Sequence, residues 1–359
     1  MAAVAWYRQD KEHVAARLQA GERPDMAMTT ATGPLDELVA LHDELGALAA
    51  LERVGTARQR AGLQDRLLLR TLAALPFVGT TGFGSLTGVL FREPAVLLRL
   101  GWSPVQLQQG DNDRHRHPDG RQVASLPCHP DTLRDALARI SDQAWQHAQQ
   151  LAVQGLFARG LVRGRVYAVD GTGLGTEGRV VALVCVSAHR PLIVAWRYLA
   201  GTASEKGREA SVTRGLIAQA LALGGPGCIR LLLADALYAD GPLLAWLKCV
   251  HGIDVLVRLP EDRLLYQDLQ QLAATDSLEW QQHRYLRVRQ GDKERCTVAL
   301  AGLGQLDNWD SFRQAAAGYG VAQATLWACL IREVAPRAQP LAEAWALASS
   351  EGQHALPVQ

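Results

Sequence analysis

The sequence contains no run of about 18 uncharged apolar residues, the length that a transmembrane helix needs, so no membrane span is expected. The amino terminus lacks a basic start followed by an apolar core, so no signal peptide is expected either. The six cysteines are scattered and none forms a C-x-x-C pair, which argues against a zinc site and against a disulfide framework. These absences predict a cytoplasmic protein with reduced thiols.

The chain also lacks an excess of charge of one sign. Its 37 Lys and Arg residues stand against 36 Asp and Glu residues, so the net charge is +1 over 359 residues. Composition alone therefore does not indicate a nucleic-acid-binding protein, and a DNA surface would have to be a local patch. The length allows two or three domains at roughly 100–200 residues per domain.

Hydrophobic periodicity predicts a helical first part of the chain. Apolar residues recur at three- and four-residue spacing between residues 35 and 75, and residues 89–101 have the pattern of another short helix. Asp131 is the expected N-cap of a further amphipathic helix. We therefore expect an α-helical N-terminal region over residues 1–160.

Short β-branched runs dominate after about residue 164. Three runs separated by turns predict a strand meander, which is followed by helix, strand, helix and strand. The order β-β-β-α-β-α-β is that of an RNase H-like fold. We expect an α/β protein in which this catalytic core starts at residues 161–263, is interrupted by a β-rich insertion at 264–340 and resumes at 341–359.

Two acids stand at the ends of apolar strands. Asp170 ends the run VYAVD, and Asp235 ends the run IRLLLAD. Reactive groups converge at strand ends in open α/β sheets, and Mg²⁺ needs only a few carboxylates besides substrate phosphate. Two such ions about 3.5–4 Å apart suit phosphodiester hydrolysis and strand transfer. The alternative is that each Asp is a turn former or helix cap.

The segments VYAVDGTGL, LLLADALYADGPLLAWL and IDVLVRLPED together resemble DDE transposases of bacterial insertion sequences, in the branch with a β-rich insertion. The resemblance covers the chain from about residue 120. It implies that Asp170 and Asp235 are the first and second catalytic acids and bind Mg²⁺ or Mn²⁺, and that Arg258 lies near DNA. It also implies that the protein cleaves double-stranded DNA at the terminal inverted repeats and transfers the strands to target DNA. The N-terminal region would bind the DNA ends, and the protein would act as a homodimer associated with the nucleoid.

The chain departs from the family pattern at the third acid, a Glu in a helix within a pattern of Tyr, Arg, Glu and Lys. No Y-x-x-R-x-x-x-E pattern follows Asp235. Glu351 lies too close to the strand expected at 345–350, and Glu333 falls inside an expected insertion strand. We interpret the third acid as missing, through truncation of the gene or an incomplete sequence. Two alternatives stay open. The protein could be a catalytically incompetent transposase remnant that still binds DNA, or a host nuclease without a preference for inverted repeats.

Basic residues on the helix expected after the meander are candidate phosphate contacts, which position a duplex without reading its sequence. They are Lys206, Arg208 and Arg214. A solvated amphipathic helix face is the alternative.

Two other patterns have simpler explanations. Gly173 to Gly178 matches G-x-G-x-x-G, but a strand follows where a dinucleotide site needs a helix, so a hairpin turn is predicted. A cluster of potential zinc ligands fits no standard spacing and is interpreted as a solvated loop. Its members are His115, His117, Cys128 and His129.

Overall fold

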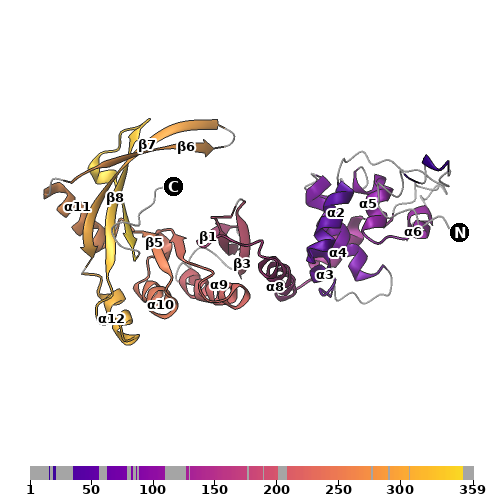
Figure 1. Cartoon of the computed structure of the whole chain (residues 1–359), viewed down its shortest axis with the longest axis horizontal. Coiled ribbons are helices and arrows are strands. Elements are labelled where there is room, and N and C mark those ends of the chain that lie inside the picture. The colour runs from indigo at the N-terminus through magenta and orange to yellow at the C-terminus, as the bar shows by residue number, and fades with distance from the viewer. Residues whose placement is uncertain are drawn as a thin grey trace. The chain divides into compact units, whose positions relative to one another are not determined.

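Two compact units, Met1–Leu156 and Phe157–Gln359, make up the chain in a computed structural model (Figure 1). The structure describes residues 16, 19–21, 35–55, 63–78, 82–83, 86, 89–109, 127–128, 130–175, 178–188, 190–200, 208–275, 278–289, 292–306 and 308–350. Each unit is considered by itself.

Every regular element described in the first unit is a helix, which agrees with the helices expected between 35 and 75 and over 89–101. The elements are α2 (Leu35–Glu44), α3 (Ala47–Leu51), α4 (Asp65–Ala74), η2 (Leu75–Val78), η4 (Leu90–Arg92), α5 (Pro94–Arg99), α6 (Pro104–Gln109), α7 (Pro130–Ala138) and α8 (Asp142–Ala158). Buried apolar side chains from α2 to α7 form one core, in which Leu68, Leu90 and Trp102 are at most 2% exposed, and Ala148 of α8 packs in a second cluster.

The expected cap of the helix near residue 131 was wrong. Helix α7 begins at Pro130, which suits the first helical turn because it has no N–H to leave unpaired. Asp131 therefore lies inside that turn, where its carboxylate is 3.1 Å from the guanidinium of Arg134. Ser141 then starts a separate helix, α8, by accepting a hydrogen bond of 3.2 Å from the backbone N–H of Ala144.

The second unit is mixed α/β, as expected, and is built on one nine-stranded sheet. Its strands are β1 (Val166–Gly173), β2 (Gly178–Cys185), β3 (Leu192–Ala200), β4 (Leu231–Ala234), β5 (Asp254–Arg258), β6 (Gln281–Arg289), β7 (Asp292–Leu306), β8 (Leu326–Ala335) and β9 (Trp345–Ser349). Its helices are α9 (Arg208–Gly224), η6 (Ala236–Tyr238), α10 (Gly241–His251), α11 (Leu264–Thr275), α12 (Asp310–Gly318) and η7 (Leu341–Glu343).

The strand order is β3-β2-β1-β4-β5-β9-β8-β7-β6. The first three strands form an antiparallel meander, and β4 and β5 run parallel to β1. Helices α9 and α10 make the two crossover connections that parallel strands require. The remaining strands, from β9 to β6, pair antiparallel and extend the same sheet.

Two helices interrupt the stretch that was expected to be β-rich. In α11 the buried residues Tyr266, Leu269 and Ala273 recur at helical spacing, and in α12 Phe312 and Ala316 do so. This spacing was present in the sequence but was outweighed by the strand-like runs around it. Figure 1 shows α12 beside α10, on the same side of the sheet as α9.

The close contact between α10 and α12 depends on a glycine. A Cβ at Gly241 would lie 2.4 Å from Oγ of Ser311, so a larger residue would push the helices apart. Among the residues that the structure describes, no helix combines the length and apolar character needed to cross a membrane.

Candidate functional site

The structure brings Asp170 and Asp235 close to each other, although only Asp235 follows the end of its strand. Asp170 lies within β1, which continues to Gly173, and Asp235 comes directly after β4. Val169 of β1 pairs with Ala234 of β4, and each aspartate is the next residue in its strand direction. Both aspartates are exposed, whereas Val169 is buried. The register of Val169 with Ala234 therefore brings the two aspartates to adjacent places in the chain segments that follow this pair.

Each aspartate also has a local structural role. Oδ1 of Asp170 accepts a hydrogen bond of 2.7 Å from the backbone N–H of Gly171. Oδ1 of Asp235 accepts one of 2.8 Å from the backbone N–H of Leu237 and so caps η6. These bonds involve one oxygen of each carboxylate and fix its orientation. The cap role is thus shown for Asp235, whereas Asp170 is no turn former because it lies within β1 and pairs with Ala182 of β2.

A buried carboxylate lies on the other side of β1. Glu209, in the first turn of α9, is 1% exposed, and its Oε2 accepts a hydrogen bond of 2.9 Å from the hydroxyl of Tyr238. Its Oε1 lies 3.0 Å from Nη1 of Arg179 in an ion pair that lacks hydrogen-bond geometry. Arg179 in turn donates a hydrogen bond of 3.0 Å from Nη2 to the carbonyl oxygen of Gly171.

The electrostatics link this network to the aspartate pair. Burial raises the pKa of Tyr238 well above its ordinary value, and its hydrogen bond to Glu209 and the negative charges of Glu209, Asp235 and Asp170 raise it further. The hydroxyl of Tyr238 therefore stays protonated and acts as a donor to Glu209. Both aspartates are near enough to this hydroxyl for their charges to act on it.

A third acid does not complete the pair within the described part of the chain. No group of three or more His, Cys, Asp or Glu side chains there is arranged to hold a metal ion. Glu333 lies in β8, where its carboxylate pairs with Arg287. Glu351 is outside the described residues.

The basic residues expected to contact DNA have structural partners where the structure describes them. The guanidinium of Arg214 lies 5.5 Å from the ring centroid of Trp246. Arg258 lies 5.3 Å from the ring centroid of Trp345 and donates a hydrogen bond of 2.7 Å to Glu261. The remaining members of this set, Lys206 and the side chain of Arg208, are outside the described residues.

The glycine-rich segment is a hairpin turn, which confirms the prediction. Gly173 of β1 pairs with Arg179 of β2, and the N–H of Leu174 donates a hydrogen bond of 2.7 Å to the carbonyl of Gly178. Of the potential zinc ligands, Cys128 is buried in the core of the helical unit. The others, His115, His117 and His129, lie outside the described residues.

The β6–β7 hairpin carries a cationic face that the sequence analysis missed. Residues paired across the hairpin share a face, and alternation along each strand extends that face. The face consists of Arg284, Leu286, Val288, Lys293 and Arg295, all exposed. It has three cations and no carboxylate, and Leu286 and Val288 are 52% and 60% exposed. The sequence signal that could have predicted this face is the spacing of these residues at every second position along each strand.

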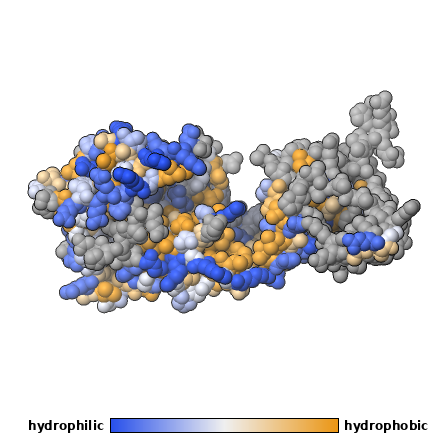
Figure 2. All heavy atoms as spheres, turned by 45° about the horizontal axis from the view of Figure 1, so that its top comes forward, coloured by the Kyte–Doolittle hydropathy of each residue, from blue (hydrophilic) through white to orange (hydrophobic). Residues whose placement is uncertain are grey.

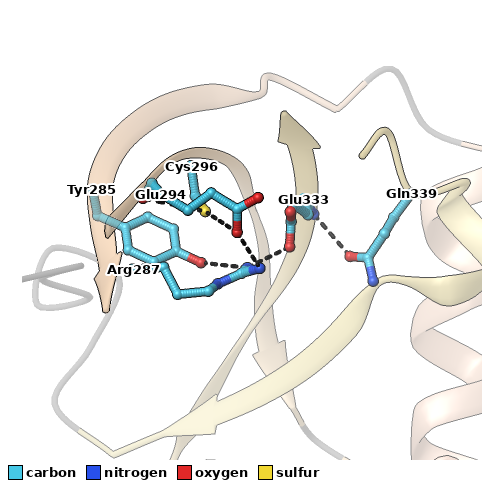
Figure 3. A network of polar contacts seen from close by, with 6 residues as sticks. All are labelled: Tyr285, Arg287, Glu294, Cys296, Glu333 and Gln339. Atoms are coloured by element: carbon cyan, nitrogen blue, oxygen red, sulfur yellow. Dashed lines mark hydrogen bonds and ion pairs between the residues drawn. The ribbon is translucent and has the colours of Figure 1, made fainter. Parts of the chain in front are cut away.

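The opposite face of the hairpin is held by ion pairs (Figure 3). Arg287 pairs with Glu333 of β8 and, at 3.4 Å, with Glu294 of β7. The hydroxyl of Tyr285 accepts a hydrogen bond of 2.9 Å from Arg287. The carboxylates therefore gather on this face, and among the described residues the cations of the other face have no partner of opposite charge on their own face. Figure 2 shows mostly hydrophilic side chains over this part of the sheet.

Comparisons with known proteins assign the chain to no group. No family model matches it, and neither a curated protein nor a solved structure matches it. A functional proposal therefore has to start from the structure itself. Its support comes from the pair Asp170 and Asp235, from the contacts of Glu209 and from the cationic face of the β6–β7 hairpin.

Proposed function

We propose that this chain is a DDE-type transposase of bacterial insertion sequences, which cleaves DNA and transfers strands at element ends in a metal-dependent reaction. The observation that carries the proposal is the pairing of Val169 with Ala234 on two parallel strands, since Asp170 and Asp235 are the residues that directly follow this pair. The strand order β3-β2-β1-β4-β5, with helical crossovers, supports an RNase H-like core. In this proposal β6, β7 and β8 belong to the insertion.

The chemistry of the two aspartates fits a Mg²⁺ or Mn²⁺ site. Their carboxylates are hard oxygen ligands, they are exposed, and a backbone N–H orients each of them. A divalent ion held there would supply activation of a water molecule and stabilisation of the leaving oxygen in phosphodiester cleavage. Asp170 and Asp235 would hold the ion, and their exposure leaves room for a phosphate of the substrate.

The proposed partner is double-stranded DNA, which the cationic face of the β6–β7 hairpin supports. A two-stranded ribbon can enter the major groove of B-form DNA, and three unopposed cations would contact phosphates. Arg214 and Arg258 stay proposed contacts, as do Lys206 and Arg208. The helical unit would bind the terminal inverted repeats, and two copies of the chain would hold the two ends.

The proposal is tested by cleavage of duplex DNA that carries inverted repeats, in the presence of Mg²⁺ or Mn²⁺. Asp170→Asn and Asp235→Asn should each abolish nicking, because each removes a metal-binding charge. Asp292→Asn, which changes an exposed acid of the hairpin, should leave nicking intact. Nicking that survives in both site variants would show that the aspartate pair does not carry the activity.

The second candidate is a DNA-binding transposase remnant without catalytic competence. Among the described residues, no third acid is arranged with the pair to hold a metal ion, which favours this candidate. This candidate predicts salt-sensitive DNA binding without nicking in either metal. A host nuclease of similar fold would instead nick duplexes with and without inverted repeats equally.

A further inference from the structure

We infer that Glu209 is a positioning residue that holds the two aspartate-bearing segments, strand β1 and the turn after β4, in a fixed relation to each other. The inference rests on the proposed metal site, and it concerns a buried acid that the transposase proposal does not use. The supporting observation is that the carboxylate of Glu209 has two partners. Arg179 connects it to the chain next to Asp170, and Tyr238 connects it to the turn that Asp235 caps.

On the β1 side, Glu209 acts through Arg179 and Gly171. The guanidinium of Arg179 pairs with Glu209 and donates to the carbonyl of Gly171, the residue directly after Asp170. A Cβ at Gly171 would lie only 2.8 Å from Oε2 of Glu209, so the strand and the carboxylate are in close contact. Movement of Glu209 would therefore shift the strand at Asp170.

On the β4 side, Glu209 acts through Tyr238. Tyr238 is the last residue of η6, the single turn whose N-cap is Asp235. The hydrogen bond from its hydroxyl to Glu209 ties the end of this turn to α9. Because the turn has only three residues, fixing Tyr238 also restricts Asp235.

Glu209 is not placed as a direct metal ligand. The Glu209 carboxylate lies on the face of β1 to which a side chain at Gly171 would point. The side chain of Asp170 points to the opposite face, because the side chains of neighbouring residues alternate between the two faces of a strand. Glu209 also has two partners of its own, Arg179 and Tyr238, and its side chain is 1% exposed. Its effect on a bound ion is therefore indirect, like that of outer-shell groups that orient ligands.

The test uses the full chain with Glu209→Gln, which keeps the size of the side chain but removes the charge that pairs with Arg179. Hydrogen exchange without metal should show faster exchange in both residues 166–173 and 231–240. Mn²⁺ titration should show a dissociation constant raised about 10-fold or more, as is usual when an outer-shell partner is lost. Glu333→Gln, which breaks an Arg–Glu pair of the hairpin, should change neither measurement.

Tyr238→Phe is the second variant, for the case that Glu209→Gln does not fold. It removes one oxygen and should accelerate exchange around Asp235 and weaken Mn²⁺ binding. Unchanged hydrogen exchange in residues 166–173 and 231–240 of a folded variant would overturn the inference. Failure of the wild-type chain to bind Mn²⁺ through Asp170 would overturn the proposed function instead, while the metal-free exchange result would still decide the role of Glu209.

Discussion

The hydroxyl of Tyr238 donates a hydrogen bond of 2.9 Å to Oε2 of Glu209, and this bond ties the turn after β4 to the first turn of α9. Both side chains are 1% exposed. The bond therefore forms in a setting where neither group has water as an alternative partner, so its loss leaves a buried acceptor unsatisfied.

This bond predicts a loss of stability in alkali. Burial and the Glu209 contact raise the pKa of Tyr238 above its ordinary value of 10.0, so the unfolded chain binds fewer protons than the folded chain above about pH 10. The contribution of the Tyr238 hydroxyl to the free energy of unfolding is thus fully present below pH 10. It falls as the pH rises, by up to about 1.4 kcal/mol per pH unit.

Urea denaturation between pH 9 and 11 measures this dependence. Tyr238→Phe should be less stable at pH 9 but should lose less stability as the pH is raised. Equal pH slopes in the wild type and in Tyr238→Phe would contradict the assignment of the effect to this hydroxyl.

Gly171→Ala should destabilise the α/β unit. The added methyl group would lie 2.8 Å from Oε2 of Glu209 and 3.2 Å from Nη2 of Arg179, so buried charged groups would have to move. Overpacking of this kind costs about 1–3 kcal/mol. Gly173→Ala in the same strand is the matched control, because no atom lies within 4 Å of its added Cβ. Equal unfolding midpoints for the two variants would rule out the strained contact.

The cationic hairpin face should contribute to DNA affinity through phosphate contacts. Replacement of Arg284, Lys293 and Arg295 by Gln should weaken duplex binding and reduce the salt dependence of the binding constant by about 0.9 per lost contact in a double-logarithmic plot. Arg313→Gln removes an exposed cation of α12 and serves as the control. An unchanged slope in the triple variant would mean that DNA does not contact this face.

A buried hydrogen bond should stabilise the helical unit. The hydroxyl of Thr71 donates to the carbonyl of Leu67 at 2.6 Å and accepts from Nε1 of Trp102 at 3.0 Å. Thr71→Val keeps the shape but leaves the indole N–H of Trp102 unpaired, at a cost of about 1–3 kcal/mol. Denaturation followed by tryptophan fluorescence measures the loss, and Thr71→Ser, which retains the hydroxyl, should be closer to the wild type.

Local sequence patterns predicted most of the elements that position the aspartate pair. Apolar runs that end in Asp170 and Asp235 were sufficient to predict the two strands. The expected strand end was right at Asp235 but wrong at Asp170, because β1 continues to Gly173 through its pairing with β2. Helices α11 and α12 were missed because their few buried residues are spaced among polar ones. The boundary at Ser141 was missed because two consecutive helices have one continuous periodicity.

The sequence by itself determined the local propensities: a helical first part, strands and crossover helices in the second, and an acid after each of two apolar runs. Only the tertiary structure decided that β1 and β4 pair in parallel with Val169 opposite Ala234, which makes the two aspartates neighbours. Tertiary packing also decided that Glu209 contacts both sides of that pair. These relations depend on strand pairing and helix packing between residues far apart in the chain, and local periodicity carries no information about which distant segments meet.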